Sequence, residues 1–336
     1  MESLTRALGR GGPQVSAVGL GFMSLGGAYA QQNTLEERLA FLDRAHEVGS
    51  RFWDTADAYA NTEEIIGKWF ARSGKRADIF VATKGAIDRS TGIPIVRSDA
   101  EYLKGACEKS LKKLGVDYID LYYAHRVAYE TPIEETIMGL VELMKEGKIR
   151  HIGLSEVSSE TLRRAHAVHP IAAVQVEYSP FTLDLEDPKI DLLNTCRELG
   201  IALVAYSPLG RGFLTGQIKK IEDLIDPNRK TIPRYSGENF PKVLDIVKTL
   251  EDIGRRKGVS SSQITIAWVM AQDELIIPIP GTRTIKYLEQ NTEAGKVTLN
   301  PEEIREIRDV VEKANLSGSR TYPGYDDYLF SDTKPL

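Results

Sequence analysis

The chain has 336 residues, of which 42% are hydrophobic, and its formal net charge is −5. It can bury a large core, and its acidic balance disfavours a nucleic-acid or membrane surface as the main partner, because phosphate polymers are bound by clustered Lys and Arg. Cys107 and Cys196 form no CxxC motif, which favours a reducing compartment. No apolar leader or membrane-length run is present, so we expect a cytoplasmic protein, monomeric or weakly homo-oligomeric.

Short apolar segments alternate with longer amphipathic ones along the chain. We predict eight strands, at residues 19–23, 51–56, 79–84, 119–125, 150–155, 172–178, 202–207 and 276–280. Several are continuous apolar runs, as at residues 203–206, which is typical of parallel strands buried on both faces. The alternation predicts an α/β fold, a (β/α)8 TIM barrel formed by residues 1–336 as a single domain.

Capping signals mark the predicted helix starts. In a capping box, a Ser, Thr or Asn side chain accepts an orphan backbone N–H, and a Glu or Gln three residues later reaches back. The boxes are expected at Thr34 and Glu37, Asn61 and Glu64, Ser98 and Glu101, Thr131 and Glu134, and Ser260 and Gln263. Pro132 and Pro301 are expected at first helical positions, where the missing N–H costs nothing.

Three segments extend the basic unit. Residues 6–9 and 14–18 flank a Gly-Arg-Gly-Gly-Pro turn, which predicts an N-terminal β-hairpin that caps the bottom of the barrel. Residues 241–257 and 301–313 are predicted as two extra helices. The segments 210–240 and 317–336 are irregular, as binding loops often are. We expect the C-terminal tail, about residues 315–336, to pack on or near the active-site mouth.

A doubly wound sheet is the competing architecture. Its dinucleotide-binding fingerprint, G-x-G-x-x-G between a strand and a helix, is missing, because Gly19-Leu20-Gly21 is followed by Phe-Met-Ser. The absence of this fingerprint favours the barrel.

Four polar residues lie where barrel enzymes place their chemistry, at the C-terminal ends of strands. Asp54, Lys84 and His125 end the second, third and fourth predicted strands or lie near their ends, and Tyr59 follows the second. A lysine that closes an apolar strand must reach solvent or pair with a carboxylate, and Asp54 is the neighbouring candidate. An ammonium near Tyr59 would lower the phenol's pKa and make it a usable general acid. His125 is placed to orient a substrate oxygen.

Taken singly, each of these residues has an ordinary alternative. Asp54 alone could be a cap or turn residue, Tyr59 a surface tyrosine, Lys84 a rim lysine and His125 a structural histidine. The other histidines have no partner at metal-ligand spacing, so no metal site is expected. The four candidates meet only if the strands form a barrel.

Four separated motifs carry a family resemblance. They are DTADAY at residues 54–59, VATK at 81–84, DYIDLYYAH at 117–125 and GKIRHIGLS at 147–155. In this order, along almost the whole chain, they resemble the aldo-keto reductase family. The motifs at 153–158 and 163–169 look closest to the branch that includes pyridoxal reductases and auxin-induced-type reductases.

The resemblance implies NADPH-dependent reduction of an aldehyde or ketone, with Asp54, Tyr59, Lys84 and His125 as the catalytic tetrad and Tyr59 as general acid. It implies a cofactor extended across the barrel mouth, held by Ser155, Gln175, Tyr206, Ser207, Leu209, Gly212, Gly281, Thr282, Arg283, Gln290 and Asn291. The expected substrate pocket comprises Tyr29, Trp53, Ile87, Arg126 and Phe181. The tail aromatics Tyr322, Tyr325, Tyr328 and Phe330 either line that pocket or pack on the barrel.

The implied cofactor contacts differ in kind. Ser155 and Gln175 would hold the nicotinamide carboxamide, and Tyr206 would stack on the ring. Backbone N–H groups of residues 207–212 would cradle the pyrophosphate. Arg283, at a helix start, would bind the 2′-phosphate, and residues 290–291 would meet the adenine.

The chain departs from the family pattern at two places. Glu156 stands where many relatives have Asn, and it could accept the carboxamide N–H. Gly281 and Thr282 stand where many have Lys and Ser, which leaves Arg283 with more of the phosphate binding.

Two other functions remain open at this point. The first is a nicotinamide-binding regulatory subunit of the same fold with little turnover. The second is a barrel enzyme that uses Lys84 as a Schiff-base nucleophile. The physiological substrate is not indicated by the sequence.

Overall fold

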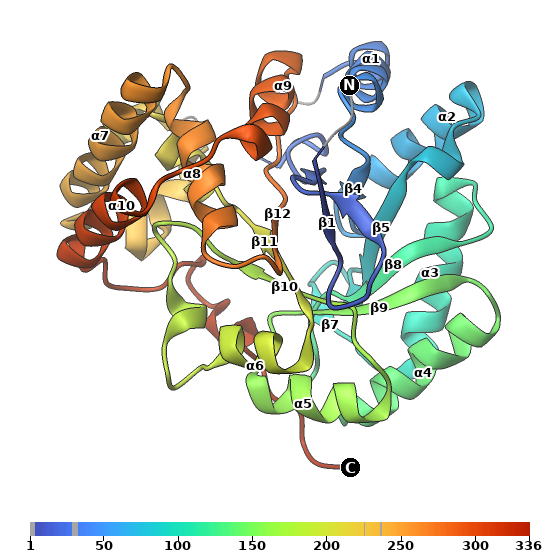
Figure 1. Cartoon of the computed structure of the whole chain (residues 1–336). Helices are drawn as coiled ribbons and strands as arrows, with labels where there is room; N and C mark the ends of the chain where they lie inside the picture. Colours follow the sequence, from blue (N-terminus) through green and yellow to red (C-terminus); the bar gives the residue numbers. More distant parts are fainter. Residues whose placement is uncertain (1–3, 29–32, 225, 236) are drawn as a thin grey trace.

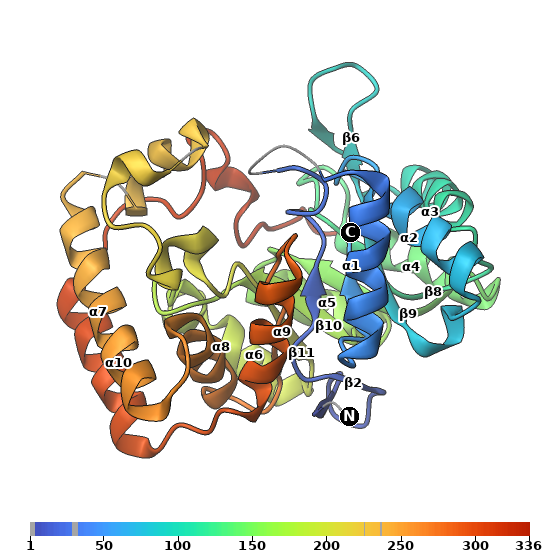
Figure 2. The same ribbon diagram turned by 90° about the horizontal axis from the view of Figure 1, so that it is seen from above.

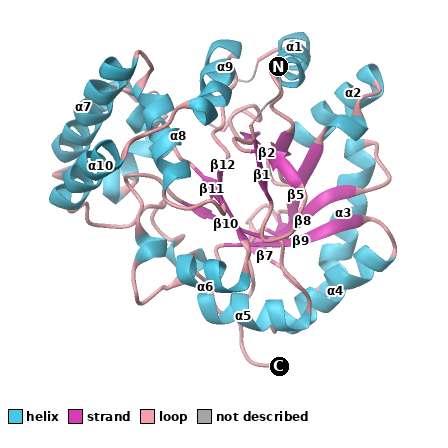
Figure 3. Cartoon of the chain, viewed as in Figure 1, coloured by secondary structure: helices cyan, strands magenta, loops and turns pink. Residues whose placement is uncertain are grey.

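The computed structural model describes residues 4–28, 33–224, 226–235 and 237–336. Its centre is one eight-stranded sheet in which every neighbouring pair of strands is parallel (Figures 1 and 3). The spatial order is β12-β11-β10-β9-β8-β5-β4-β3. These strands are β3 (Leu20–Gly21), β4 (Phe52–Asp54), β5 (Phe80–Gly85), β8 (Ile119–Ala124), β9 (Ile149–Ser155), β10 (Ala173–Glu177), β11 (Ala202–Tyr206) and β12 (Ile276–Pro278).

Two backbone hydrogen bonds join the first strand of the sheet to the last. The N–H of Gly19 donates to the Pro278 carbonyl at 2.9 Å, and that of Gly21 donates to the Pro280 carbonyl at 3.2 Å. The sheet is therefore closed into a barrel, and the predicted (β/α)8 fold is confirmed, with all eight predicted strands present.

Helices cover the outside of the barrel, as Figure 1 shows. Those of the repeating unit are α1 (Leu35–Glu47), α2 (Thr62–Ser73), α3 (Ala100–Leu114), α4 (Ile133–Lys145), α5 (Ser159–Val168), α6 (Leu192–Leu199), α8 (Ser261–Ala271) and α9 (Ile285–Glu293). The two predicted extra helices are confirmed as α7 (Asn239–Lys257) and α10 (Pro301–Ala314). They pack against each other, and α7 also packs on α8. No helix in the described ranges is both long and apolar enough to cross a membrane.

Alternate residues of each strand enter two different parts of the core, because successive side chains of a strand point to opposite faces. On β5, Ala82 belongs to the cluster inside the barrel and Val81 to the cluster between barrel and helices. On β4 the same alternation places Phe52 inside and Trp53 outside. This alternation decides which predicted side chains reach the mouth.

The N-terminal hairpin consists of β1 (Thr5–Ala7) and β2 (Gln14–Ser16), paired antiparallel as predicted. Leu8 and Val15 join the cluster inside the barrel. The Arg6 guanidinium donates to the carbonyls of Met270, Asp273 and Ile276, just before and within β12. The hairpin thus covers the N-terminal end of the barrel, and the mouth at the other end stays free for a ligand.

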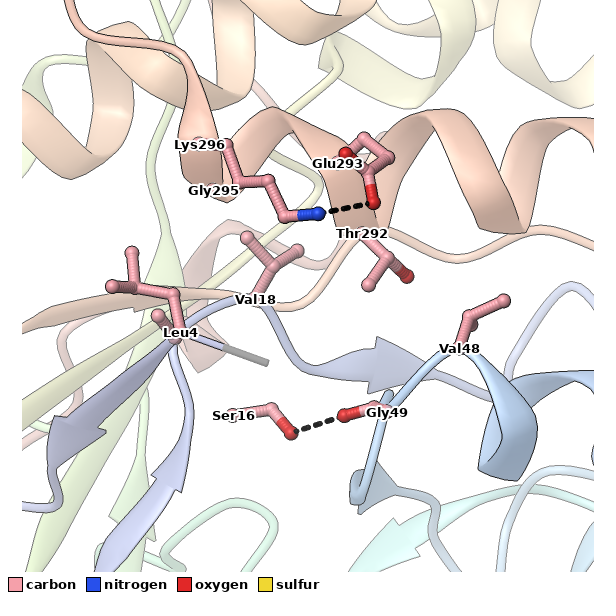
Figure 4. Close-up of a pocket in the computed structure, with 10 residues that line it drawn as sticks. Leu4, Ser16, Val18, Val48, Gly49, Thr292, Glu293, Gly295 and Lys296 are labelled. Atoms are coloured by element: carbon pink, nitrogen blue, oxygen red, sulfur yellow. Dashed lines mark hydrogen bonds and ion pairs between the residues drawn. The ribbon is translucent and has the colours of Figure 1, made fainter. Parts of the chain in front are cut away.

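A small hollow lies beside the hairpin, between residues 4–18, the end of α1 and the end of α9 (Figure 4). Its volume is about 20 Å³, enough for one or two waters. Two local contacts line it: the Ser16 hydroxyl donates to the Gly49 carbonyl, and Lys296 pairs with Glu293 at 2.7 Å. The hollow is too small to be a substrate site.

The predicted helix caps have mixed outcomes. The boxes at Thr34 and Ser260 are confirmed, and so is Pro301 at the first helical position, after a further box formed by Asn300 and Glu303. The other predictions are wrong, and for Asn61 and Ser98 the reason is a tertiary contact of the side chain. Asn61 accepts from Arg38, and Ser98 accepts the N–H of Ala128, so that Asp99 caps α3 instead. Thr131 and Pro132 both precede α4, which has no side-chain cap.

A second small hairpin, β6 (Ile87–Asp88) with β7 (Ile95–Val96), follows β5 and projects from the barrel in Figure 2. The sequence analysis did not predict it, because its strands are only two residues long.

Candidate active site

A cavity of about 630 Å³ opens at the C-terminal ends of the strands. This volume falls within the roughly 300–1,000 Å³ of small-molecule sites. The predicted site residues that line it are Asp54, Tyr59, His125, Arg126, Ser155, Gln175, Tyr206, Ser207, Leu209, Gly212, Gly281, Thr282 and Asn291. Residues far apart in the sequence are thus brought to one mouth, as a barrel brings the ends of its strands.

Asp54 and Lys84 form a buried ion pair. The Lys84 Nζ lies 2.5 Å from Asp54 Oδ1, and it also donates to the Thr55 carbonyl at 2.6 Å. The second carboxylate oxygen, Oδ2, accepts from the Gln175 amide at 2.8 Å. Burial raises the pKa of Asp54 and lowers that of Lys84, and the pair opposes both shifts. Lys84 is fully buried and does not line the cavity, so the structure gives no support to a Schiff-base role.

Tyr59 lies next to both this pair and His125. The Lys84 Nζ is 5.1 Å from the centroid of the Tyr59 ring. The ring also meets His125 edge-on, with centroids 5.7 Å apart and an interplanar angle of 84°. Tyr59 follows β4 in a turn, and its side chain is partly exposed to the cavity.

The expected lowering of the Tyr59 pKa is not found. Burial and the Asp54 carboxylate raise this pKa above its ordinary value of 10.0. The ammonium does not reverse the shift, because its charge is balanced by Asp54 at 2.5 Å. Tyr59 therefore keeps its proton throughout the neutral range, as a proton donor must.

His125 is neutral at neutral pH. Burial, and then the nearby Arg126 guanidinium, hold the pKa of its imidazole well below the ordinary value of 6.5. Its Nδ1 is buried and has no hydrogen-bond partner among the described residues. A neutral imidazole still has one N–H to donate, so it can hold a carbonyl oxygen without adding charge.

Asp57, two residues before Tyr59, provides a pH test. Burial, and then the neighbouring Glu63, raise the pKa of Asp57 to about 7. In the unfolded chain the pKa of this carboxyl is near 3.8. Its contribution to the free energy of unfolding is therefore complete below about pH 3.8 and is lost as the pH rises through 7. We expect Asp57→Asn to flatten the dependence of the free energy of unfolding on pH between about 4 and 7. The difference should be roughly 2 kcal/mol, since the side chain is partly exposed.

The measurement is urea denaturation of both proteins at several pH values. Asp117→Asn, at an exposed position before β8, is the matched control. Parallel curves for wild type and Asp57→Asn would contradict the raised pKa.

A buried network lies beside the cavity, at the ends of β9, β10 and β11. Glu156 accepts two hydrogen bonds from Arg320, at 2.7 and 3.0 Å, and one from the Tyr206 hydroxyl at 2.9 Å. Glu177 accepts from Arg211 at 2.9 Å and from the Tyr235 hydroxyl at 2.9 Å. The exposed fractions of Arg320 and Glu156 are 1% and 0%, so each charge depends on the other.

Arg320 belongs to the C-terminal segment that follows α10. The same segment returns to β9, where the Ser331 N–H donates to the Glu156 carbonyl and the Ser331 carbonyl accepts from Ser158. The segment thus lies against the mouth, and Tyr322 lines the cavity. Glu156 could have been an acceptor for a nicotinamide amide, but its carboxylate is occupied by Arg320 and Tyr206.

Several predicted pocket residues lie elsewhere. Trp53 is fully buried outside the barrel, because Asp54 takes the inward position on β4. Phe181 packs against Tyr235 beneath the loop after β11. Ile87 lies in the β6–β7 hairpin and does not line the cavity. Tyr29 lies outside the described residues.

Two predicted cofactor residues also lie beyond the cavity wall. Arg283 immediately precedes the N-cap of α9, and Gln290 lies within that helix. Gly281 pairs with Gly21 of β3 and packs closely against the residues there. A Cβ at this position would lie 2.9 Å from Ser24 Oγ and 3.1 Å from the Gly21 carbonyl.

The sequence analysis missed the Glu156–Arg320 pairing. Arg320 is a single arginine in an irregular tail, and no spacing in the sequence links it to a strand end 164 residues away. The sequence analysis offered four tail aromatics as possible pocket residues. Only the folded structure shows that, of these four, Tyr322 lines the cavity.

A closed (β/α)8 barrel with ionisable side chains gathered around one mouth cavity defines an α/β-barrel enzyme. Comparisons with known proteins specify the family. The model of the aldo/keto reductase family matches residues 17–312, and the chain belongs to this family. In the described ranges no group of three or more His, Cys, Asp or Glu side chains is arranged to hold a metal ion.

Three relatives illustrate the match. The aldo-keto reductase str7 of Strobilurus tenacellus is 50% identical over 94% of both chains. The aldo-keto reductase yakc [NADP(+)] of Schizosaccharomyces pombe is 44% identical over all of this chain and 99% of its own. The structure of a glycerol dehydrogenase from Gluconobacter oxydans is 26% identical, with a TM-score of 0.82, over 94% of this chain and 98% of that one. These relatives support an oxidoreductase.

Proposed function

We propose that this protein reduces an aldehyde or ketone to an alcohol with NADPH, using Tyr59 as the proton donor. One observation carries the proposal. The Tyr59 ring lies next to both the buried Asp54–Lys84 pair and neutral His125, and Tyr59 and His125 both line the cavity. The motifs at 153–158 and 163–169 further favour the branch of the family that includes pyridoxal reductases and auxin-induced-type reductases.

The residues around the cavity fit a nicotinamide. Ser155 accepts from Arg126 through its oxygen, so its O–H remains available to donate to a carboxamide carbonyl. Gln175 is held at Asp54 through its NH₂ group, and its carbonyl oxygen is the acceptor for a carboxamide N–H. The Tyr206 ring is anchored by its hydroxyl at Glu156, as a stacking ring requires.

The loops after β11 and β12 fit the phosphates. Ser207, Gly210, Arg211 and Gly212 all have positive φ, a backbone form that favours an anion-binding concavity, and the N–H groups of Gly210 and Gly212 donate within the loop, to the carbonyls of Ser207 and Leu209. The N-cap of α9, Thr284, makes no side-chain cap hydrogen bond, so orphan N–H groups remain at a helix end that favours anions. Arg283 precedes this end and supports a preference for NADP over NAD.

The bound cofactor would supply the hydride to the carbonyl carbon. The side chains supply the rest. His125 donates to the carbonyl oxygen and orients it, and Tyr59 transfers its phenolic proton to that oxygen as negative charge develops there. Lys84, held by Asp54 and Thr55, remains beside the resulting phenolate until Tyr59 takes a proton from water in the cavity.

The direct test is oxidation of NADPH and NADH by the purified protein with aliphatic aldehydes, aromatic aldehydes and ketones. We expect NADPH to be consumed in the presence of several carbonyl compounds, with a kcat/KM at least about tenfold higher than for NADH, since the bidentate phosphate contact of one arginine is worth that much. Tight NADPH binding without turnover of any carbonyl would contradict the proposal and indicate a regulatory subunit instead.

A further inference from the structure

Arg126 is the cationic side chain closest in sequence to the proposed reacting groups. It follows His125 at the end of β8 and lines the same cavity as Tyr59. Its Nη1 donates to the His125 carbonyl at 2.6 Å and to the Ser155 hydroxyl at 3.0 Å. Among the described residues no hydrogen bond engages its Nε or Nη2, and neither atom is enclosed. One edge of the guanidinium is therefore open to the cavity.

No carboxylate of the described residues forms an ion pair with Arg126, and Glu156, whose pKa the charge of Arg126 helps to lower, is already paired with Arg320. Lys84, Arg211 and Arg320 each have a carboxylate oxygen within 3 Å, at 2.5, 2.9 and 2.7 Å. For Arg126, no carboxylate of the described residues lies within 4.0 Å of the guanidinium. A hydroxyl and a carbonyl satisfy hydrogen bonds but cancel no charge, and a half-buried unpaired charge is costly. Such a charge in a cleft indicates a ligand of opposite sign.

The side chains that line the reacting end of the cavity carry a net positive charge. Asp54 and Lys84 cancel each other, and His125 is neutral because burial and Arg126 lower its pKa. The acidic side chains of the network, Glu156 and Glu177, are occupied by Arg320 and Arg211. Asp57 does not line the cavity, so the charge of Arg126 is the charge without an ion-pair partner among the described side chains that line its reacting end.

The phosphates of a cofactor do not account for this charge. The loops that fit them follow β11 and β12, whereas Arg126 follows β8. In the order β12-β11-β10-β9-β8, the strand β8 is four steps from β12, which is halfway around an eight-stranded ring (Figure 1). Arg126 therefore lies across the barrel from Arg283, on the side of Tyr59 and His125.

We propose that Arg126 binds a carboxylate of the substrate, so that the preferred carbonyl compounds of this protein are anionic aldehydes or ketones. The inference rests on the proposed function, whose Tyr59 and His125 hold the carbonyl oxygen. The open edge of the guanidinium accepts a carboxylate in bidentate fashion. Arg126 then acts as a specificity residue and takes no part in the transfer of hydride or proton.

The test compares matched substrates with NADPH: para-carboxybenzaldehyde and its neutral methyl ester. We expect wild-type protein to favour the carboxylate about 10- to 100-fold in kcat/KM, mainly through KM, as a charge-assisted contact provides. In Arg126→Met the ratio of the two kcat/KM values should fall to about one, and Arg126→Lys should keep part of it. Arg255→Met, on the exposed end of α7, is the control and should keep the full ratio.

The outcomes are distinguishable. Turnover of both aldehydes by wild type at equal kcat/KM, or an unchanged ratio in Arg126→Met, overturns the assignment of Arg126 and leaves the proposed function standing. Absence of turnover with either aldehyde contradicts the proposed function itself.

Calorimetric titration of terephthalate into the NADP⁺-loaded protein tests Arg126 without catalysis. Binding by wild type that Arg126→Met loses supports the proposal, and equal binding by both overturns it. A second substrate pair, para-formylphenyl phosphate and para-methoxybenzaldehyde, distinguishes the anion. A larger preference for the phosphate than for the carboxylate would contradict the carboxylate assignment.

Discussion

Tyr59→Phe is expected to lower kcat for carbonyl reduction by about 10²- to 10⁴-fold, the usual contribution of a positioned general acid. The substitution removes one hydroxyl and keeps the ring that lies against Lys84 and His125. NADPH affinity, measured by fluorescence titration, should stay within about twofold of wild type. The rate is followed by the loss of NADPH absorbance.

The matched control is Tyr118→Phe. Tyr118 precedes β8, at the opposite end of the barrel from the cavity, and its ring packs beneath Arg76 and Arg150. The Tyr118→Phe variant should reduce carbonyl compounds at the wild-type rate. Wild-type turnover by Tyr59→Phe would remove Tyr59 as the proton donor. Because the Tyr59 pKa is raised above 10.0, the rate of reduction in wild type should also stay level across the neutral range and fall only in strong alkali.

Arg320→Met should lower the free energy of unfolding by about 3–5 kcal/mol, the cost of leaving one partner of a buried ion pair uncompensated. Glu156 is fully buried, and burial alone would raise its pKa. Arg320, and then the charge of Arg126 and the Tyr206 hydroxyl, bring that pKa below its ordinary value. Without Arg320 the carboxylate must become protonated or draw in water. Urea denaturation at neutral pH measures the loss.

A double-mutant cycle isolates the pair. Arg320→Met with Glu156→Gln should be destabilised by less than the sum of the single variants, because no unpaired charge remains. Additive losses would show that Arg320 stabilises the fold only by packing. The KM for NADPH should rise in both single variants, since Glu156 also holds the Tyr206 hydroxyl. A surface pair, Arg72 with Asp43, is the control and should contribute at most about 1 kcal/mol.

The agreement between sequence and structure is best where the relevant interactions are local. The eight strands were predicted from apolar runs, and the caps at Thr34 and Ser260 from residues three positions apart. The cap predictions at Asn61 and Ser98 failed because long-range contacts compete for those side chains. Asn61 is taken by Arg38 and Ser98 by Ala128, so neither caps its helix.

The same division applies to the candidate site. The strand ends at Asp54, Lys84 and His125 could be located in the sequence, because parallel strands in a barrel bring their C-terminal ends to one mouth. Trp53, the neighbour of Asp54, was wrongly predicted to line the substrate pocket. It faces outward, because the closed sheet sets which positions of a strand point into the barrel.

By itself, the sequence determined the barrel, the family and the positions of Tyr59 and its three neighbours, because strand periodicity and four local motifs encode them. Only the tertiary structure decided the charge state of the site. Whether an ionisable group is paired depends on residues from other strands and from the tail. Lys84 is balanced by Asp54, and Glu156 is bound by Arg320. These pairings span 30 to 164 residues, beyond the reach of any local pattern.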